Sequence, residues 1–107
     1  LPPRKSRSYA YCSDTIYDES IVPIIKGVDL LYHEATFLAE KEKWATLTFH
    51  STTHQAGKIA VAAKANKLLI GHYSARYRDL SPFLNEAKAV FQNTELAIEG
   101  ESVEIED

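Results

Sequence analysis

The chain has 107 residues, of which 45% are hydrophobic and 25% are charged, and its formal net charge at pH 7 is −3. These values are those of an ordinary soluble globular protein, either one small domain or a large piece of a bigger one. They argue against a general nucleic-acid binder, which is usually basic, and no apolar run approaches the roughly 20 residues of a membrane-spanning helix.

Residues 1–8 are predicted to form an extended linker from an upstream part of the protein, ahead of a domain that covers residues 9–107. Two prolines disfavour a helix in this linker, and the other residues are mostly basic or polar. The chain begins with Leu1 and contains no methionine, so we expect its natural start to lie elsewhere. Cys12 is the single cysteine, which excludes an internal disulfide and fits a reducing cytoplasm.

The first half of the chain predicts two strands separated by a short helix. Residues 8–12 alternate aromatic and small side chains, as a strand does. Residues 17–26 predict a short helix that ends at Gly27 and buries three isoleucines, Ile21, Ile24 and Ile25. Residues 28–32 form a nearly continuous apolar run, which is typical of a strand covered on both faces.

The second half begins with an ambiguous segment, in which residues 38–44 are expected to be helical. The next helix is the clearest, because Thr52 and Gln55 have the spacing of a capping box. Its packing face is expected to carry four small or branched side chains, Ile59, Ala60, Ala62 and Ala63. Residues 67–71 predict a second buried strand.

The last helix is expected to run from Ser81 as N-cap to about Phe91, with Pro82 at its first position. Residues 95–99 and 102–106 alternate apolar and charged side chains and are interpreted as edge strands, in one version a hairpin. The alternation of strands and helices along the chain indicates an α/β fold with a largely parallel sheet.

Asp14 and His72 each follow a predicted strand. Because the carboxyl ends of parallel strands meet at one edge of a sheet, these side chains are candidate ligands of zinc or manganese. Taken singly, Asp14 is equally typical of a helix N-cap or a turn, and His72 of a structural histidine. A zinc site needs at least three protein ligands, and the sequence offers no further compact cluster.

His50 stands two residues before the capping Thr52, near the positive end of the helix dipole, where the N–H groups of residues 51–54 could hold a phosphate. A histidine there could donate a proton to a leaving oxygen, with Glu34 keeping it oriented and protonated. Alternatively, His50 belongs to a cap and Glu34 is a surface charge. Arg76 is interpreted either as a phosphate clamp or as a surface ion-pair residue.

Four short segments, in this order, closely resemble the C-terminal part of ribonuclease Z. They are Ser13-Asp14-Thr15, His33-Glu34-Ala35-Thr36-Phe37, His50-Ser51-Thr52-Thr53 and Gly71-His72-Tyr73-Ser74-Ala75-Arg76-Tyr77. The resemblance covers residues 4–107, and its specificity comes from all four segments together. That family matures the 3′ ends of transfer RNA and belongs to the metallo-β-lactamase superfamily.

The resemblance implies an α/β fold that is the C-terminal half of a metallo-β-lactamase αββα sandwich, with two zinc ions in the complete enzyme. Asp14 matches the carboxylate that bridges both metals, and His72 matches the last histidine ligand. His50 matches the histidine that protonates the leaving oxygen, and Glu34 matches its supporting acid. The residues implied near the phosphate are Ser51, Thr52, Ser74 and Arg76.

The reaction implied by the resemblance is hydrolysis of precursor tRNA on the 3′ side of the discriminator nucleotide, which leaves a 3′ hydroxyl. A cytoplasmic homodimer without membrane attachment is also expected. The family's His-x-His-x-Asp-His cluster, a further histidine ligand and the arm that grips tRNA are upstream features that this sequence lacks. We therefore expect the 107 residues alone to be inactive.

Two alternatives remain at this point. One is another phosphodiesterase of the same fold, acting on small or cyclic nucleotides, and the other is a non-catalytic α/β interaction module. If the chain is half of a sandwich, one face of its sheet is bare, and we expect this piece to associate with another chain.

Overall fold

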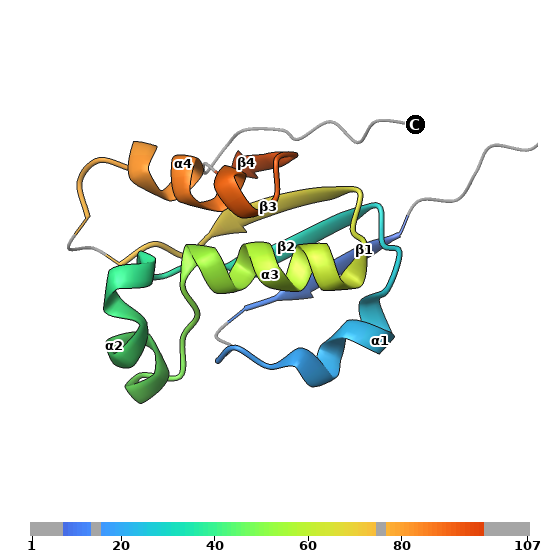
Figure 1. Ribbon diagram of the computed structural model, residues 1–107, viewed down its shortest axis with the longest axis horizontal. Helices are drawn as coiled ribbons and strands as arrows, with labels where there is room; N and C mark the ends of the chain where they lie inside the picture. The colour runs from blue at the N-terminus through green and yellow to red at the C-terminus, as the bar shows by residue number, and fades with distance from the viewer. Residues whose placement is uncertain (1–7, 14–15, 75–76, 98–107) are drawn as a thin grey trace, which may run out of the picture.

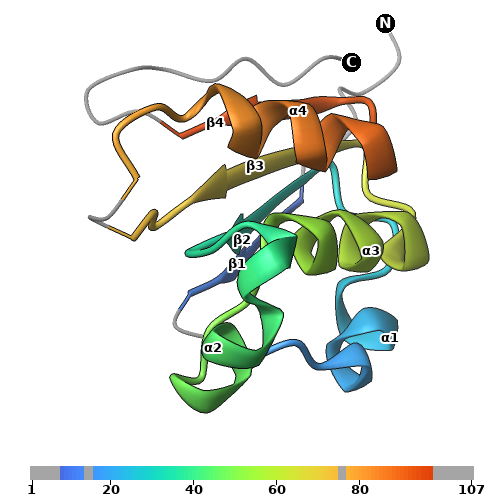
Figure 2. The same cartoon turned by 60° about the vertical axis from the view of Figure 1, so that its left-hand side comes forward.

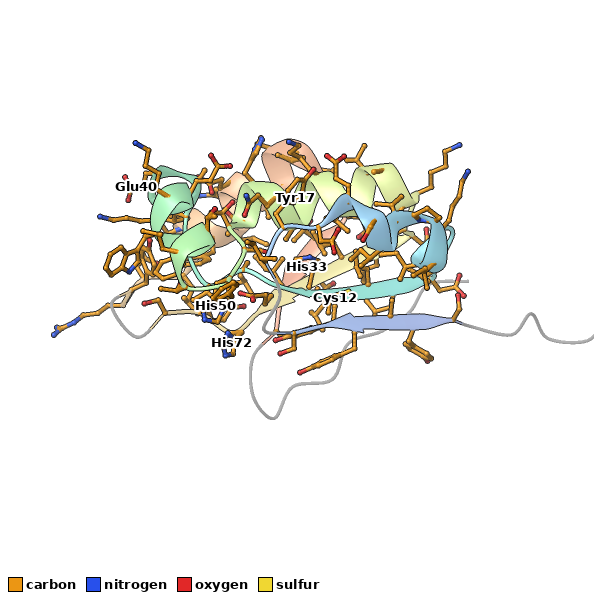
Figure 3. The ribbon with its side chains drawn as sticks, turned by 90° about the horizontal axis from the view of Figure 1, so that it is seen from below. Cys12, Tyr17, His33, Glu40, His50 and His72 are labelled. Carbon is orange, nitrogen blue, oxygen red and sulfur yellow. The ribbon has the colours of Figure 1, made fainter. Side chains whose placement is uncertain are left out.

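The computed structural model describes residues 8–13, 16–74 and 77–97. The described chain forms two layers, a four-stranded sheet and a set of helices on one of its faces (Figure 1). Figure 3, viewed from below, shows these helices on one side of the sheet, whose edge strand is β1. The predicted linker, the candidates Asp14 and Arg76, and the predicted strand 102–106 lie wholly or largely outside the described residues.

The sheet has the order β1-β2-β3-β4, and every neighbouring pair is parallel. Its strands are β1 (Tyr9–Cys12), β2 (Leu30–Glu34), β3 (Lys67–Gly71) and β4 (Thr94–Leu96). Each crossover contains helix, as parallel neighbours require. The α/β class and the parallel sheet are therefore confirmed, and β3 has the predicted bounds.

Short helices precede the two longer ones. A 3₁₀ turn (Glu19–Ile21) leads into α1 (Val22–Ile25), and a second 3₁₀ turn (Ala39–Lys41) leads into α2 (Glu42–Leu47). The longer helices are α3 (Thr53–Ala63) and α4 (Ser81–Val90), which pack against each other. Figure 2 shows α2 apart from them, near the ends of β1 and β2. No helix among the described residues has the length and apolar character needed to cross a membrane.

The core lies between the sheet and the helices. Leu31, Leu68 and Ile70 point to this side from β2 and β3 and are fully buried. They meet the small face of α3, including Ala56 and Ala60, because short side chains let a helix approach a sheet closely. Phe83 of α4 completes this core and is also fully buried.

No helix of the described part covers the opposite face of the sheet. Tyr9 and Tyr11 of β1 are 63% and 73% exposed there, and the ring of Tyr11 stacks on that of Tyr32 at 4.5 Å between centroids. A strand covered on both faces was predicted for residues 28–32, but within this chain helices cover only one side. The bare face agrees with the expectation for half of a sandwich, and association through it stays a prediction.

Several local predictions were wrong. The strand predicted from Val28 begins at Leu30. Ile24 is 83% exposed, because α1 is a single turn that directs Ile25 to the core. Ala62 is also exposed, since it lies on the outer side of α3. Ser81 is inside α4 and Leu80 precedes it as N-cap. The side chain of Leu80 makes no capping hydrogen bond, and the Ser81 N–H donates to Oδ1 of Asp79.

The capping box at the start of α3 is confirmed. Thr52 is the N-cap, and its hydroxyl accepts from the Gln55 N–H at 3.2 Å, while the Gln55 side chain accepts from the Thr52 N–H at 2.9 Å. His54 in the first turn is exposed. The box fixes where α3 begins and hence where the preceding residues, including His50, are held.

Candidate active site

The candidate site is built where β2 and β3 end. Glu34 is the last residue of β2 and pairs in register with Gly71, the last residue of β3. The next residue after β3 is His72, and the run into α3 brings His50 to the same edge. Figure 3 shows His50 and His72 next to each other at this edge, and their ring centroids are 5.4 Å apart.

Glu34 is fully buried, and its carboxylate holds His50. The Nδ1 atom of His50 lies 3.0 Å from Oε1 and 3.2 Å from Oε2 of Glu34, and the side chain of His50 is 23% exposed. The Ser51 N–H also donates to Oε2, at 3.3 Å. A buried carboxylate with several donors is positioned to fix the orientation of an imidazole ring.

Thr36 connects this pair to His72. Its hydroxyl donates to Oε2 of Glu34 at 2.5 Å, and the same oxygen lies 3.1 Å from Nδ1 of His72 and 3.4 Å from Nδ1 of His50. Glu34 and Thr36 are two residues apart in an extended segment, so their side chains share a side. These four residues, Glu34, Thr36, His50 and His72, are called the Glu34 cluster below.

The Glu34 cluster offers donor atoms that suit a metal ion. One atom each from Glu34, His50 and His72 lies within 4.8 Å of the others. Imidazole nitrogen and carboxylate oxygen are ligands that zinc accepts. Because Glu34 and His50 bond to each other, His72, which is exposed at the edge of the sheet, is the member of this set that an ion approaching from solvent can use.

The candidates Ser51 and Thr52 are buried, with exposed fractions of 0% and 1%. The N–H groups of residues 51, 52 and 53 donate to Glu34, Gln55 and the Phe37 carbonyl, so these three groups already bond within the chain. The expectation that they would hold a phosphate is therefore not supported. The roles of Ser51 and Thr52 near a substrate stay predictions.

Ser74 is half-buried, and its N–H donates to the Thr36 carbonyl at 2.9 Å, which places it beside the Glu34 cluster. Asp14 and Arg76 lie outside the described residues, so their assignments also stay predictions. The sequence reasoning gave Thr36 no role. A signal was present, because a hydroxyl two positions after Glu34 in an extended segment falls on the same side.

The segment between β2 and α3 is also fastened to α4. A carboxylate oxygen of Glu86 accepts from the Ala39 N–H at 2.7 Å and from the Thr53 hydroxyl. This carboxylate lies at the positive end of α3, where a negative charge is stabilising. It helps to fix the region from which His50 extends.

His33 lies next to Glu34 in β2 but on the core side of the sheet. It is fully buried, and its Nδ1 donates to the Glu34 carbonyl at 2.8 Å. No hydrogen-bond partner for Nε2 is found among the residues that the structure describes. Desolvation in this apolar setting lowers the pKa of His33 below its usual value, so the neutral ring is favoured in the folded protein.

This burial predicts a pH dependence of stability. The unfolded chain takes up a proton on His33 near pH 6.5, whereas the folded chain does so only at lower pH. The folded state therefore loses stability as the pH falls below about 6.5. We expect His33→Asn to lose less stability than the wild type between pH 7.5 and pH 5.5, measured by urea unfolding. Equal losses in both proteins would contradict this.

The chain is similar in sequence to proteins named ribonuclease Z. Over all 107 residues it is 54% identical to the protein named ribonuclease Z from Cytophaga hutchinsonii, of which it covers 34%. Over 93 residues it is 59% identical to ribonuclease Z from Porphyromonas gingivalis, covering 87% of this chain and 30% of the relative. The chain closely matches the C-terminal part of ribonuclease Z. It spans about a third of the length of these curated relatives.

Solved structures identify the fold. The metallo-β-lactamase fold protein YhfI from Bacillus subtilis matches with a TM-score of 0.79 and 31% identity, over 86% of this chain and 37% of that one. The short form of human tRNase Z matches with a TM-score of 0.66 and 27% identity, over 90% of this chain and 31% of that one. No family model matches the chain. The described sheet and helices are thus part of a metallo-β-lactamase fold, as the resemblance implied.

Proposed function

We propose that the full-length protein carrying this chain is an endoribonuclease of the ribonuclease Z type, which removes 3′ trailers from precursor tRNA. This chain supplies part of the active site. The observation that carries the proposal is the buried Glu34 carboxylate holding His50 beside His72, at the carboxyl edge of the sheet, in a chain 54% identical to a ribonuclease Z.

In this reaction water loses a proton to solvent as its oxygen bonds to the phosphorus, and the bond from phosphorus to the 3′ oxygen of the discriminator nucleotide breaks. His50 donates a proton from Nε2 to that leaving oxygen, which becomes the 3′ hydroxyl of the tRNA. Glu34 holds Nδ1 of His50, which directs Nε2 toward the substrate.

The proposed metal ligands in this chain are Asp14 and His72, and the complete enzyme holds two zinc ions with further ligands from upstream residues. His72, exposed at the edge of the sheet, offers an imidazole nitrogen of the kind that zinc accepts. When bound, zinc acts as a Lewis acid toward the phosphate and makes water an effective nucleophile at neutral pH.

Four further residues are proposed to serve the substrate. Arg76 pairs its planar guanidinium with a phosphate, and Ser74 lies two positions before it in sequence. Ser51 and Thr52 are buried between His50 and the start of α3, and they act by keeping this short segment in place. The proposed protein is a cytoplasmic homodimer, and light scattering of the purified full-length protein tests whether it is a dimer.

The deciding experiment uses the full-length protein, a precursor tRNA with a 3′ trailer, and metal analysis. We expect a product that ends in a 3′ hydroxyl, zinc in the purified protein, and loss of cleavage on chelation. His72→Ala is expected to lower the zinc content. Hydrolysis of cyclic nucleotides without tRNA cleavage would replace this proposal by the phosphodiesterase alternative, and inactivity on both substrates by the interaction module.

A further inference from the structure

We infer that Thr36 is a positioning residue that connects the buried Glu34 carboxylate to His72 and fixes which ring nitrogen of His72 carries the proton. This inference rests on the proposed function, because it treats His72 as a metal ligand. It starts from one oxygen atom, Oγ1 of Thr36, which lies within 3.1 Å of both Oε2 of Glu34 and Nδ1 of His72.

The protons at this oxygen can be assigned. A threonine hydroxyl has one proton to donate and lone pairs to accept. In the contact of 2.5 Å the hydroxyl donates to Oε2 of Glu34, so this contact uses the hydroxyl proton. The Thr36 oxygen must then accept from His72, which places a proton on Nδ1 of that ring.

This assignment leaves the lone pair of His72 on Nε2, the nitrogen turned away from Thr36. A neutral imidazole binds a metal through its unprotonated nitrogen, and a hydrogen bond at the other nitrogen fixes both tautomer and ring orientation. One buried carboxylate thereby orients two histidines, His50 directly and His72 through Thr36.

The backbone holds Thr36 firmly in this position. Its N–H donates to the Ser51 carbonyl at 3.1 Å, and its carbonyl accepts from the Ser74 N–H at 2.9 Å. These contacts join the segments on either side, which bear His50 and His72. Thr36 is only 6% exposed, so its hydroxyl exchanges little with solvent. The positioning function thus rests on a residue that cannot easily move away.

The test compares Thr36→Val, which keeps the shape and removes the hydroxyl, with Thr36→Ser, which keeps the hydroxyl, in the full-length protein. We expect Thr36→Val to weaken zinc binding about 10–100-fold, the usual effect of losing such a partner. Thr36→Ser is expected to restore it. The measurement is competition for zinc against a chelator, which needs no substrate.

Thr94→Val is the matched control. Thr94 is 2% exposed, and its hydroxyl donates to the Phe91 carbonyl at 2.6 Å, away from the Glu34 cluster. The control therefore loses a buried hydroxyl without touching the site, and its zinc affinity is expected to be that of the wild type. Equal zinc affinities in Thr36→Val and Thr94→Val would overturn the inference.

A second readout needs only the zinc-free wild type. Nitrogen-15 NMR distinguishes the two neutral tautomers of His72, and we expect the proton on Nδ1. A proton on Nε2 would overturn the inference even if Thr36→Val fails to fold.

The variant His72→Ala distinguishes failure of the proposed function from failure of the inference about Thr36. If it leaves zinc binding intact, the ligand assignment fails. If it weakens binding and Thr36→Val does not, only the positioning function of Thr36 fails.

Discussion

Replacing His50 by alanine in the full-length protein is expected to lower kcat for cleavage of precursor tRNA about 10²–10⁴-fold, with the zinc content unchanged. The loss follows from removing the group that gives a proton to the leaving 3′ oxygen, and this range is typical of general acids. Single-turnover cleavage of a labelled precursor measures it, and circular dichroism checks that the variant is folded.

His54→Ala is the matched control for this variant. His54 lies four residues further along, in the first turn of α3, and its side chain is exposed. His54→Ala removes an imidazole ring, as His50→Ala does, but from a position away from Glu34. The cleavage rate of this variant is therefore expected to stay at the wild-type value. Equal rates for His50→Ala and the wild type would refute the assignment of His50 as proton donor.

Replacing Phe83 by alanine is expected to destabilise the protein by about 3–5 kcal/mol, the usual cost of deleting a buried aromatic ring. Phe83 is fully buried, and its ring makes edge contacts with Tyr73 at 5.2 Å and Tyr77 at 4.7 Å between centroids. Those tyrosines flank the segment that follows His72. The cavity would therefore loosen the support of the site as well as the core.

Thermal and urea unfolding of the full-length protein measure this loss. Phe91→Ala serves as the comparison, because Phe91 follows α4 directly and is only partly buried. Its replacement is expected to cost clearly less than that of Phe83. A similar cost for both variants would show that the ring of Phe83 has no special place in the core.

The sequence predicted well those elements whose signals are local. The run at residues 67–71 is a strand with the expected bounds, and Thr52 and Gln55 form the expected capping box. Both patterns can be recognised within a few residues of sequence. Ile24 and Ala62 were placed on the wrong side, because burial near the end of a helix depends on what packs against it.

The candidate site divides in the same way. The sequence marked Glu34, His50 and His72 and their resemblance to ribonuclease Z, since these residue types and their order are visible in the letters alone. It could not show that Thr36 lies between Glu34 and His72, which are far apart in the chain.

The sequence by itself thus predicted most of the elements, the parallel sheet and the resemblance of this chain to ribonuclease Z. Only the tertiary structure decided how the Glu34 cluster is connected. Its hydrogen bonds require separations near 3 Å across 36 positions of sequence between Thr36 and His72. Those separations are set by the register of β2 on β3, which pairs Glu34 with Gly71. A shift of one residue in that register would turn the side chains of one strand to the other face of the sheet.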